Sequence, residues 1–469
     1  MNLPERFKER TAALIGADEA EKLFAAIESG EAVKAFRINS IKTTLADFEA
    51  SAPKIDREKA KFPPDAYLTR EEYPGSLPEH HSGAIYMQDI SAMSTTWAVK
   101  LTEGMRVLDS CSAPGGKTTQ LSAAVGDSGI VVANEYERKR ATILRQNVER
   151  MGAKNTIICN LDTAVLAETY PETFDLVLCD APCSGEGMFR KNERAVEEWS
   201  EENVLMCAER QREILTNVAK CVKKGGKLLY STCTFASEEN ELNVKWLLDT
   251  RQNFRLIPVE RELCENTSDG IMISDCDYDM TLCRRIYPHK SMGEGQFIAL
   301  FERTDDENCP AIPKNGKKSK NGKKTNEPKK TRAEIEALEA ASKFLRENLE
   351  TEPRGELILL GESIFLSPPI NLPPYSVLAA GVCVGESQKG RIIPHHQLFS
   401  AYGNDFKRKL ELTSAGHECA AYLRGEEIGA ENLGDASGFC SVLIDGCPVG
   451  GGKLSGGKCK NHYPKGLRE

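Results

Sequence analysis

The sequence predicts an α/β protein built on a doubly wound parallel sheet, and three features of the central part of the chain support this prediction. Between about residues 83 and 303, short apolar segments alternate with amphipathic segments of helical period, which is the pattern of a parallel sheet covered by helices on both faces. A turn of small residues follows the first apolar segment, and acidic residues follow three of the later ones. Such sheets bind their ligands at the edge where these residues would gather.

The expected elements of this central domain follow one another at short intervals. The strands are expected at residues 106–109, 130–134, 156–159, 174–180, 227–232 and 296–301. The helices are expected at residues 118–124, 138–151, 202–222 and 238–250. Short strands rich in Val, Ile and Leu are typical of a sheet that is buried on both faces.

The segments on either side of residues 83–303 predict two further domains and a linker. Residues 1–82 predict a small α+β region that opens with a helix over residues 5–28 and contains a strand at residues 35–39. Residues 304–332 predict a basic flexible linker, because nine Lys or Arg but only one acidic residue lie between Lys314 and Arg332. A helix at residues 332–350 and a glycine-rich, β-rich segment after it predict a C-terminal domain over residues 333–469.

The overall composition excludes several classes of protein. With 469 residues and a net charge of −9, the chain is too acidic to coat nucleic acid through its overall field. No apolar stretch approaches the roughly 18 residues of a membrane span, and the N-terminus lacks the pattern of an export signal. The sixteen cysteines include no C-x-x-C pair, so we expect reduced thiols, no metal site and a cytoplasmic protein.

The turn of small residues after the first expected strand has the features of a cofactor loop. The strand ends at Asp109, and the turn contains Cys111, Ser112, Ala113, Pro114, Gly115, Gly116 and Lys117 before the next helix. Such a turn lets the backbone approach a ligand closely. A nucleotide-binding P-loop is the alternative, but its motif requires glycine at the position of Cys111.

Three carboxylates are expected at the same edge of the sheet. Glu135 follows the second strand, Asp162 lies shortly after the third, and Asp180 ends the fourth. An acidic residue after the second strand suits the ribose hydroxyls of an adenosine, and one after the third suits the adenine amino group. For each carboxylate taken singly, capping of a helix is the alternative explanation.

Two cysteines are expected at the same cleft. Cys183 lies in the segment D-A-P-C-S-G-E-G at residues 180–187, and Cys233 lies in S-T-C-T at residues 231–234, after the fifth strand. Because the carboxyl ends of parallel strands meet at one edge, both thiols should face one cleft, where a thiolate can act as a nucleophile. The residues alone do not decide which cysteine attacks. Cys111, Cys159 and Cys179 are better explained as buried, small apolar side chains.

In these motifs the sequence resembles the Sun-type RNA cytosine-5 methyltransferases. Members carry D-A-P-C-S-G, here Asp180–Gly185, a T-C pair, here Thr232–Cys233, and A-P-G-G-K-T, here Ala113–Thr118. The resemblance implies a Rossmann-like class I methyltransferase that binds S-adenosyl-L-methionine through residues 111–117, Glu135, Asp162 and Asp180. Asn39, Gln88 and Asp89 resemble further family positions, although many relatives have Glu where Asp89 stands.

The resemblance also implies the catalytic residues. Cys233 would be the nucleophile that adds to carbon 6 of cytosine, because carbon 5 is too poor a nucleophile to take a methyl group unaided. Cys183 would assist release, since a base must remove the carbon 5 proton before the thiolate departs. Asp180 would hydrogen-bond N3 or the exocyclic amine of the base. The helix expected after Phe235 would favour the thiolate.

The last residues of the chain resemble a domain that implies the substrate. Residues 460–468 resemble the C-terminal domain, of PUA-like fold, in bacterial family members that modify small-subunit rRNA. The resemblance implies methylation of 16S rRNA, naked or in the 30S subunit, by an enzyme that we expect to be a monomer without a metal or a membrane partner. The alternatives are the same chemistry on tRNA and a non-catalytic RNA-binding factor of ribosome assembly. Methylation of an exocyclic amine is disfavoured, because that reaction needs no cysteine pair.

Overall fold

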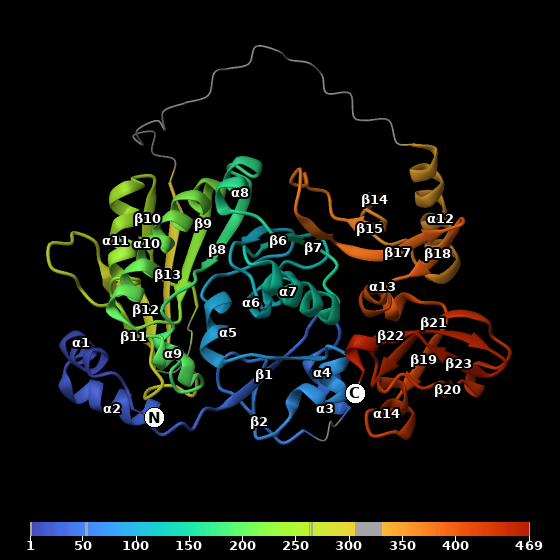
Figure 1. Cartoon of the computed structure of the whole chain (residues 1–469), viewed down its shortest axis with the longest axis horizontal. Coiled ribbons are helices and arrows are strands. Elements are labelled where there is room, and N and C mark those ends of the chain that lie inside the picture. The colour runs from blue at the N-terminus through green and yellow to red at the C-terminus, as the bar shows by residue number, and fades with distance from the viewer. Residues whose placement is uncertain (1, 52–54, 262, 264–265, 305–330, 469) are drawn as a thin grey trace, which may run out of the picture.

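The computed structural model describes residues 2–51, 55–261, 263, 266–304 and 331–468 (Figure 1). The linker predicted at residues 304–332 lies outside the described residues, apart from its first residue and its last two.

A ten-stranded mixed sheet forms the centre of the molecule. Five parallel strands are neighbours in the order β9-β8-β5-β6-β7, with bounds β5 (Arg106–Asp109), β6 (Ile130–Asn134), β7 (Thr156–Cys159), β8 (Phe174–Asp180) and β9 (Val222–Thr232). Antiparallel strands extend the sheet on both sides, namely β10 (Phe254–Ile257), β11 (Ser268–Asp269), β12 (Arg284–Ile286) and β13 (Gln296–Arg303) beyond β9, and β16 (Val377–Ala380) beyond β7. The predicted α/β class is confirmed, and the six predicted strands correspond to β5 to β9 and β13.

Helices cover both faces of the parallel strands, as a doubly wound sheet requires. Neighbouring side chains of a strand enter different cores, so Val107 lies in one core with Leu121, whereas Leu108 lies in another with Leu166 and Leu215. The covering helices are α6 (Gly116–Val125) and α7 (Arg138–Met151) on one face, and α8 (Thr163–Thr169), α10 (Glu201–Val218) and α11 (Glu241–Thr250) on the other. Helix α5 (Ile90–Trp97) packs against α6 and β13.

Two of the predicted helices have different ends in the structure. The helix predicted at residues 202–222 ends at Val218, because a short 3-10 turn follows and Val222 already begins β9. The helix predicted from residue 238 begins at Glu241. The sequence predicts a helix that follows Phe235, whereas in the structure residues 236–240 lie between Phe235 and this helix.

The N-terminal part contains two units that pack separately. Helices α1 (Glu5–Ile15) and α2 (Ala17–Glu28) share a core with Phe189 and Phe235 of the main domain. An antiparallel sheet of its own has the order β2 (Arg57–Lys59), β3 (Ala66–Thr69), β1 (Lys34–Ile38) and β4 (Ile85–Met87). The prediction of one helix over residues 5–28 is wrong, because Gly16 adopts a φ of 86° that a continuous α-helix does not allow.

The C-terminal part begins with the predicted helix, α12 (Arg332–Asn348), and contains two small sheets. One has the order β14 (Glu356–Leu360), β15 (Ser363–Ser367), β17 (Val382–Gln388) and β18 (Arg391–Pro394). The other has the order β19 (Lys409–Leu412), β21 (Gly438–Ile444), β22 (Cys447–Ser455), β23 (Lys458–Asn461) and β20 (Ile428–Gly429). Figure 1 shows this part beside the β7 side of the main sheet.

The remaining elements are short helices and 3-10 turns. These are α3 (Leu45–Ala50), α4 (Pro78–His81), α9 (Glu193–Glu197), α13 (His396–Tyr402), α14 (His417–Leu423) and the 3-10 helices η1 (Pro74–Ser76), η2 (Glu186–Met188), η3 (Ala219–Cys221), η4 (Met280–Leu282), η5 (Gly403–Asp405), η6 (Glu431–Leu433) and η7 (Lys465–Leu467). Across the residues described, no helix is long and apolar enough to cross a membrane. The same residues hold no group of three or more His, Cys, Asp or Glu side chains that could bind a metal ion.

The sheets cross two of the predicted domain boundaries. β4 lies after residue 82 but pairs with β1 of the N-terminal sheet. β16 lies in the predicted C-terminal domain, yet it pairs with β7 of the main sheet. At these two strands, one predicted domain supplies a strand to the sheet of another. The domain boundaries themselves stay predictions.

Candidate active site

The predicted site residues lie at the edge of the main sheet where the strand order changes direction. From β5 the chain continues to β6 and β7 on one side, whereas β8 pairs with β5 on the other side. A crevice forms at such a point because the loops leave the sheet in opposite directions. The loop after β5 and the two cysteine motifs, after β8 and β9, all leave the sheet at this edge.

The loop after β5 lines a cavity of about 250 Å³ at this edge. Of the predicted cofactor residues, Cys111, Ser112, Ala113, Pro114, Gly116, Lys117 and Asp180 line it. Gly115 has a φ of 111° and precedes α6, in a conformation that favours glycine. A Cβ atom at Gly116 would lie 3.0 Å from the side chain of Gln88, so the loop packs closely against Gln88 and leaves little room for a side chain at this position.

Asp109, the last residue of β5, is a site residue that the sequence reasoning did not single out. Its Oδ2 atom accepts a hydrogen bond from Thr118 Oγ1 at 2.7 Å, whereas its buried Oδ1 atom has no partner among the described residues. Burial raises the pKa of this carboxyl group to about 7. An unpaired buried oxygen in the cavity wall fits a polar ligand, because buried polar groups are normally hydrogen-bonded. The rule that identified the other strand-end carboxylates applies to Asp109 equally.

Glu135 and Asp162 lie at the same sheet edge but do not line this cavity. Glu135 is buried, and its Oε1 atom accepts a hydrogen bond from the backbone N–H of Glu137 at 2.9 Å. Asp162 is exposed and caps α8, where its Oδ1 atom accepts from the backbone N–H of Ala164 at 2.8 Å. The second oxygen of Glu135, Oε2, lies 3.7 Å from the Arg140 guanidinium, a long ion pair that leaves it able to accept a hydrogen bond from a ligand.

An ion pair joins the cofactor loop to the first cysteine motif. Lys117 Nζ donates to Asp180 Oδ2 at 2.7 Å, and Ser231 Oγ donates to Asp180 Oδ1 at 2.6 Å. Burial of Lys117 works against its charge, but attraction to Asp180, Cys233 and Asp109 outweighs it and raises the pKa of the amine. The lysine is therefore a fixed positive charge at neutral pH.

The two predicted cysteines meet, as expected from their positions. The Sγ atoms of Cys183 and Cys233 lie 3.2 Å apart, too far for a disulfide, and both thiols are free and part-buried. The contact with Cys233, burial and the charge of Glu239 together raise the pKa of Cys183 well above its usual value. The surroundings are thus asymmetric, since a carboxylate faces Cys183 while the Lys117 cation interacts with Cys233. The two thiols therefore differ in their electrostatic surroundings although their sulfur atoms are in contact.

Two buried glutamates, neither predicted, hold the two cysteine motifs together. Glu186 Oε2 accepts from Thr234 Oγ1 at 2.9 Å and from the backbone N–H of Phe235 at 3.0 Å, so it links the loop of Cys183 to the loop of Cys233. Glu239 Oε2 accepts from the backbone N–H of Ser184 at 3.1 Å. Glu186 was visible within the first motif, but only the fold shows that it reaches the second.

Of the other cysteines named in the sequence analysis, Cys159 and Cys179 are buried, whereas Cys111 is part-buried and lines the cavity. Cys159 and Cys179 are fully buried within the sheet, and burial raises the pKa of Cys159 to about 12. Cys111 contacts Cys179, and this contact together with burial raises its pKa well above the usual value. These environments agree with small apolar side chains that do not react.

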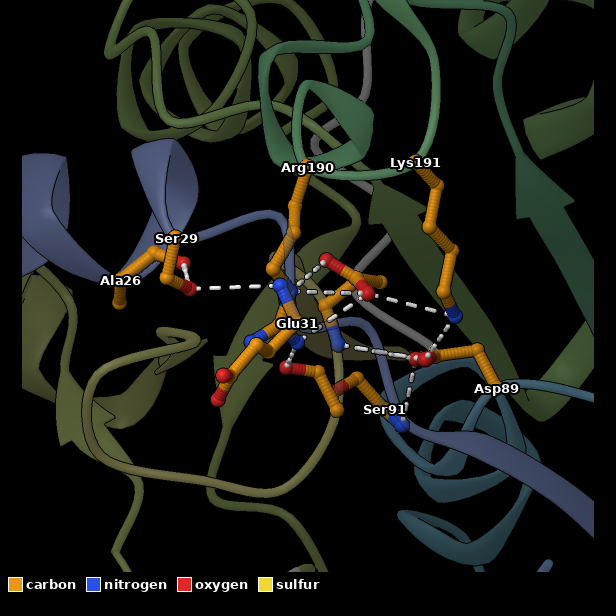
Figure 2. A network of polar contacts seen from close by, with 9 residues as sticks. Ala26, Ser29, Glu31, Asp89, Ser91, Arg190 and Lys191 are labelled. Atoms are coloured by element: carbon orange, nitrogen blue, oxygen red, sulfur yellow. Dashed lines mark hydrogen bonds and ion pairs between the residues drawn. The ribbon is translucent and has the colours of Figure 1, made fainter. Parts of the chain in front are cut away.

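Asn39, Gln88 and Asp89 each connect parts of the structure. Asn39 Nδ2 donates to the backbone oxygens of Gly83 and Met151, and Gln88 Oε1 accepts from Arg37. Asp89 caps α5 through the backbone N–H of Ser91, pairs with Lys191 at 3.1 Å and accepts from the backbone N–H of Glu294 (Figure 2). A carboxylate at position 89 therefore joins α5 to the segment that follows the first cysteine motif.

Comparisons with known proteins identify the family of three parts of the chain. Residues 96–302 match the family model "16S rRNA methyltransferase RsmB/F", and residues 3–90 match the N-terminal domain of 16S rRNA methyltransferase RsmF. Residues 408–469, which contain the β19 to β23 sheet, match the RsmF PUA domain. The β-rich, PUA-like prediction for the C-terminus is confirmed, and the matched domain covers only the second of its two sheets.

Related proteins extend the match over most of the chain. "Ribosomal RNA small subunit methyltransferase F" of Shewanella amazonensis is 31% identical over 400 residues, which cover 84% of this chain and 82% of the relative. The protein of the same name from Vibrio campbellii is 28% identical and covers 99% of this chain and 97% of its own. A crystal structure of a methyltransferase homologue from Pyrococcus horikoshii aligns with a TM-score of 0.56 at 27% identity, over 64% of this chain and 95% of the other. The chain belongs to the ribosomal RNA small subunit methyltransferase F family, whose members are S-adenosylmethionine-dependent methyltransferases.

Proposed function

We propose that this enzyme transfers a methyl group from S-adenosyl-L-methionine to carbon 5 of cytosine in 16S rRNA, with Cys233 as nucleophile and Cys183 as the residue that assists product release. The observation that carries the proposal is the 3.2 Å contact between the two sulfur atoms, beside a cavity whose wall includes Lys117 and Asp180. Both thiols can therefore reach one substrate base, which supports their assignment to one reaction.

Cys233 is the better nucleophile because of its electrostatic surroundings. The Lys117 cation interacts with Cys233, whereas the contact with Cys233, burial and the charge of Glu239 raise the pKa of Cys183 well above its usual value. Attack by the Cys233 thiolate on carbon 6 of cytosine forms a C–S bond and moves an electron pair toward carbon 5 and N3. Carbon 5 then becomes nucleophilic enough to accept a methyl group.

In this proposal the cofactor loop, Glu135 and Asp162 hold the cofactor. Residues 111–114, Gly116 and Lys117 line the cavity, and the unpaired Oδ1 atom of Asp109 offers a hydrogen-bond acceptor in its wall. When bound, S-adenosyl-L-methionine supplies the methyl group as an electrophile. Glu135 and Asp162 would bind its ribose and adenine from the ends of β6 and β7.

Asp180 holds the base, in this proposal, without giving up its present partners. Each carboxylate oxygen accepts more than one hydrogen bond, so Oδ1 and Oδ2 can accept from the exocyclic amine of cytosine while Ser231 and Lys117 stay bound. The Lys117 cation beside Asp180 balances the negative charge that develops on the base during attack.

Cys183 acts after methyl transfer. Once Cys233 is a thioether, it no longer carries the negative charge that opposes ionisation of Cys183, and the Cys183 proton can leave to water. The Cys183 thiolate then takes the proton from carbon 5, the C–S bond breaks, and Cys233 departs as a thiolate. One proton is released for each methyl group transferred, so the sequence of steps balances.

The substrate and its setting are also part of the proposal. The RNA is small-subunit rRNA, free or within the 30S particle, and the enzyme works as a monomer in the cytoplasm. Support comes from the curated relatives, whose names specify the small-subunit ribosomal RNA. Residues 1–82 and 333–469 would bind the RNA around the target, while residues 83–303 carry the reaction.

Denaturing gel electrophoresis of cysteine variants tests the mechanism. Cys183→Ala, incubated with unmodified 16S rRNA and S-adenosyl-L-methionine, should give a slowly migrating, nuclease-sensitive complex of protein and RNA, because the adduct forms but is not released. Cys233→Ala should give none. The control is Cys276→Ala, which removes another part-exposed free thiol and should behave as wild type.

Other outcomes would contradict the assignment of roles. A covalent complex with Cys233→Ala but not with Cys183→Ala would mean that Cys183 is the nucleophile and Cys233 assists release. If neither variant trapped RNA and both still methylated it, the covalent mechanism would be wrong.

A further inference from the structure

A second cavity, of about 410 Å³, lies next to the reaction cavity. The first turn of α5 separates the two, since Asp89 and Ala92 line the reaction cavity whereas Ile90 and Ser91 line the second. The β2–β3 hairpin and the loop at residues 289–292 form its other walls. Its volume is within the range of cavities that bind small molecules.

The charge of this second cavity suits an anion. Lys59, Lys61 and Lys290 line it, against a single acidic residue, Glu58, although the chain as a whole carries a net charge of −9. Glu19 pairs with Lys290 at 3.0 Å and offsets part of this charge. Basic side chains concentrated at one place on an acidic protein attract phosphate groups.

The remaining wall combines an apolar surface with unused hydrogen-bonding groups. Phe62, Ile90 and Met292 provide the apolar surface, and Met292 is 54% exposed. The hydroxyl oxygens of Ser91 and Ser291 are buried and have no hydrogen-bond partner among the described residues. Ser91 itself is 1% exposed, so solvent does not satisfy its hydroxyl group.

His289 adds an acceptor to the same wall. Its Nε2 atom lies 3.1 Å from Glu19 Oε2, and contacts with Lys22, Lys290 and His289 lower the pKa of Glu19 to about 2, so this carboxylate accepts and Nε2 carries the proton. Burial lowers the pKa of His289 below its usual value, so the ring is neutral at pH 7. The Nδ1 atom, which has no partner among the described residues, is then an acceptor.

A nucleotide has three chemical features that match the walls of this cavity. Its phosphate matches the lysines, the face of its base matches the apolar surface, and an N–H group of the base matches the acceptors. The lone anion of a buffer or a metabolite would leave the apolar surface unused.

We propose that this second cavity binds a nucleotide of the substrate RNA that flanks the target cytosine. The proposal rests on the proposed function, because it places the flanking nucleotide one helical turn from the reaction cavity. An unstacked target base separates from its neighbours in the strand, and a neighbouring nucleotide then needs a site of its own. By binding the nucleotide next to the target cytosine, the cavity contributes to the selection of the base that is methylated.

Contacts join the flanking-nucleotide cavity to the catalytic loops. The backbone N–H of Ser91 donates to Asp89, which binds Lys191 and the backbone of Glu294 (Figure 2). Gly295, the next residue, donates its N–H to Gly187 in the first cysteine motif. Residues of the cavity wall are therefore fixed relative to the residues that react.

Steady-state kinetics with unmodified 16S rRNA test this inference. Lys59→Glu and Met292→Asp change exposed side chains and should each raise KM for RNA by about tenfold, the loss expected for a phosphate contact or a stacked base. Binding of S-adenosyl-L-methionine should not change. Matched controls are Lys224→Glu, at the opposite end of β9 from Cys233, and Met272→Asp, whose methionine is also 54% exposed but does not line the cavity.

Photocrosslinking provides an independent measurement. Substrate RNA that contains 4-thiouridine should crosslink to peptides that include residues 55–68 or 287–292, and Met292→Asp should reduce that crosslink. Unchanged KM in both variants, with no crosslink to these peptides, would overturn the proposal. So would binding of free AMP that Met292→Asp abolishes without any change in KM for RNA, since the cavity would then serve a free nucleotide.

The covalent trap separates this inference from the proposed mechanism. If Cys183→Ala still traps RNA while the cavity variants behave as wild type, only the flanking-nucleotide site is wrong. If Cys183→Ala traps nothing, the mechanism is wrong whatever the cavity variants show.

Discussion

Lys117 Nζ lies 2.7 Å from Asp180 Oδ2, so the loop that follows β5 and the motif that ends β8 are held by one ion pair. Lys117 is 13% exposed and Asp180 29% exposed, which limits screening by solvent. The same lysine also interacts with Cys233. One side chain therefore couples the cofactor loop, the residue proposed to bind the base and the proposed nucleophile.

Lys117→Met should make Cys233 less reactive at neutral pH. Without the cation, Cys233 loses the positive charge that interacts with it, and its alkylation at pH 7 should slow by about tenfold. Iodoacetamide labelling of Cys233 at pH 7, followed by mass spectrometry, measures this rate. Lys224→Met is the control, and equal rates for both variants would remove the electrostatic reason for choosing Cys233.

Glu239→Gln should flatten the dependence of stability on pH. Burial raises the pKa of Glu239 to about 7, above its ordinary value of 4.5. Because the folded state holds the proton more tightly, the stabilisation is complete below pH 4.5 and is lost as pH rises through 7. Between pH 6 and pH 8 the free energy of unfolding of the wild type should fall by about 1 kcal/mol more than that of the variant. Urea unfolding at the two pH values measures the difference, and parallel losses would contradict it.

Arg285→Met should destabilise the protein strongly, whereas a double change should not. Arg285 and Glu241 form an ion pair in which both side chains are at most 2% exposed, and Arg285 also donates to the backbone oxygen of Phe235. Removing one partner leaves a buried charge and should cost about 3–5 kcal/mol. The double variant Arg285→Met with Glu241→Met should recover most of this loss in urea unfolding. Equal destabilisation in the single and double variants would show that packing, not charge, is what the pair provides.

Lys42→Met should loosen the contact between the N-terminal and C-terminal parts. The buried Nζ atom of Lys42 donates to the backbone oxygens of Ser82 and Pro448 and to Ser400 Oγ, at 2.6 to 2.8 Å. Losing these bonds leaves buried acceptors unpaired, at a cost on the order of 3 kcal/mol. Hydrogen–deuterium exchange should quicken in α13 and β22. Lys407→Met, which removes an exposed lysine that also donates to backbone oxygens, should leave exchange there unchanged.

The strands and the cofactor loop were predictable because their signals are local. Val107, Leu108 and Asp109 followed by small residues show a strand and its turn within a dozen positions. The meeting of Cys183 and Cys233 followed from a rule about parallel strands, which place their carboxyl ends at one edge. Both predictions needed only the order of the elements.

What the sequence did not reveal depends on contacts between distant residues or on backbone geometry. The apolar spacing of residues 5–28 continues across Gly16, so the break at its positive φ leaves no trace in the periodicity. Glu186 and Glu239 look like ordinary surface acids, and only the fold buries them between the two cysteine motifs. The cavity beside α5 joins three segments that are far apart in sequence.

The pairing of β16 with β7 sets an order of events during synthesis. Residues 156–159 are buried, and their outer edge is covered by a strand that lies more than 200 residues later. While the ribosome is still translating residues 160–376, the emerging main sheet has an open edge, which is a site for pairing with other chains. The catalytic sheet is complete only after residue 380 has emerged, when α12 and part of the C-terminal region are already present. A newly made molecule therefore finishes its catalytic sheet only after its synthesis has passed into the C-terminal region.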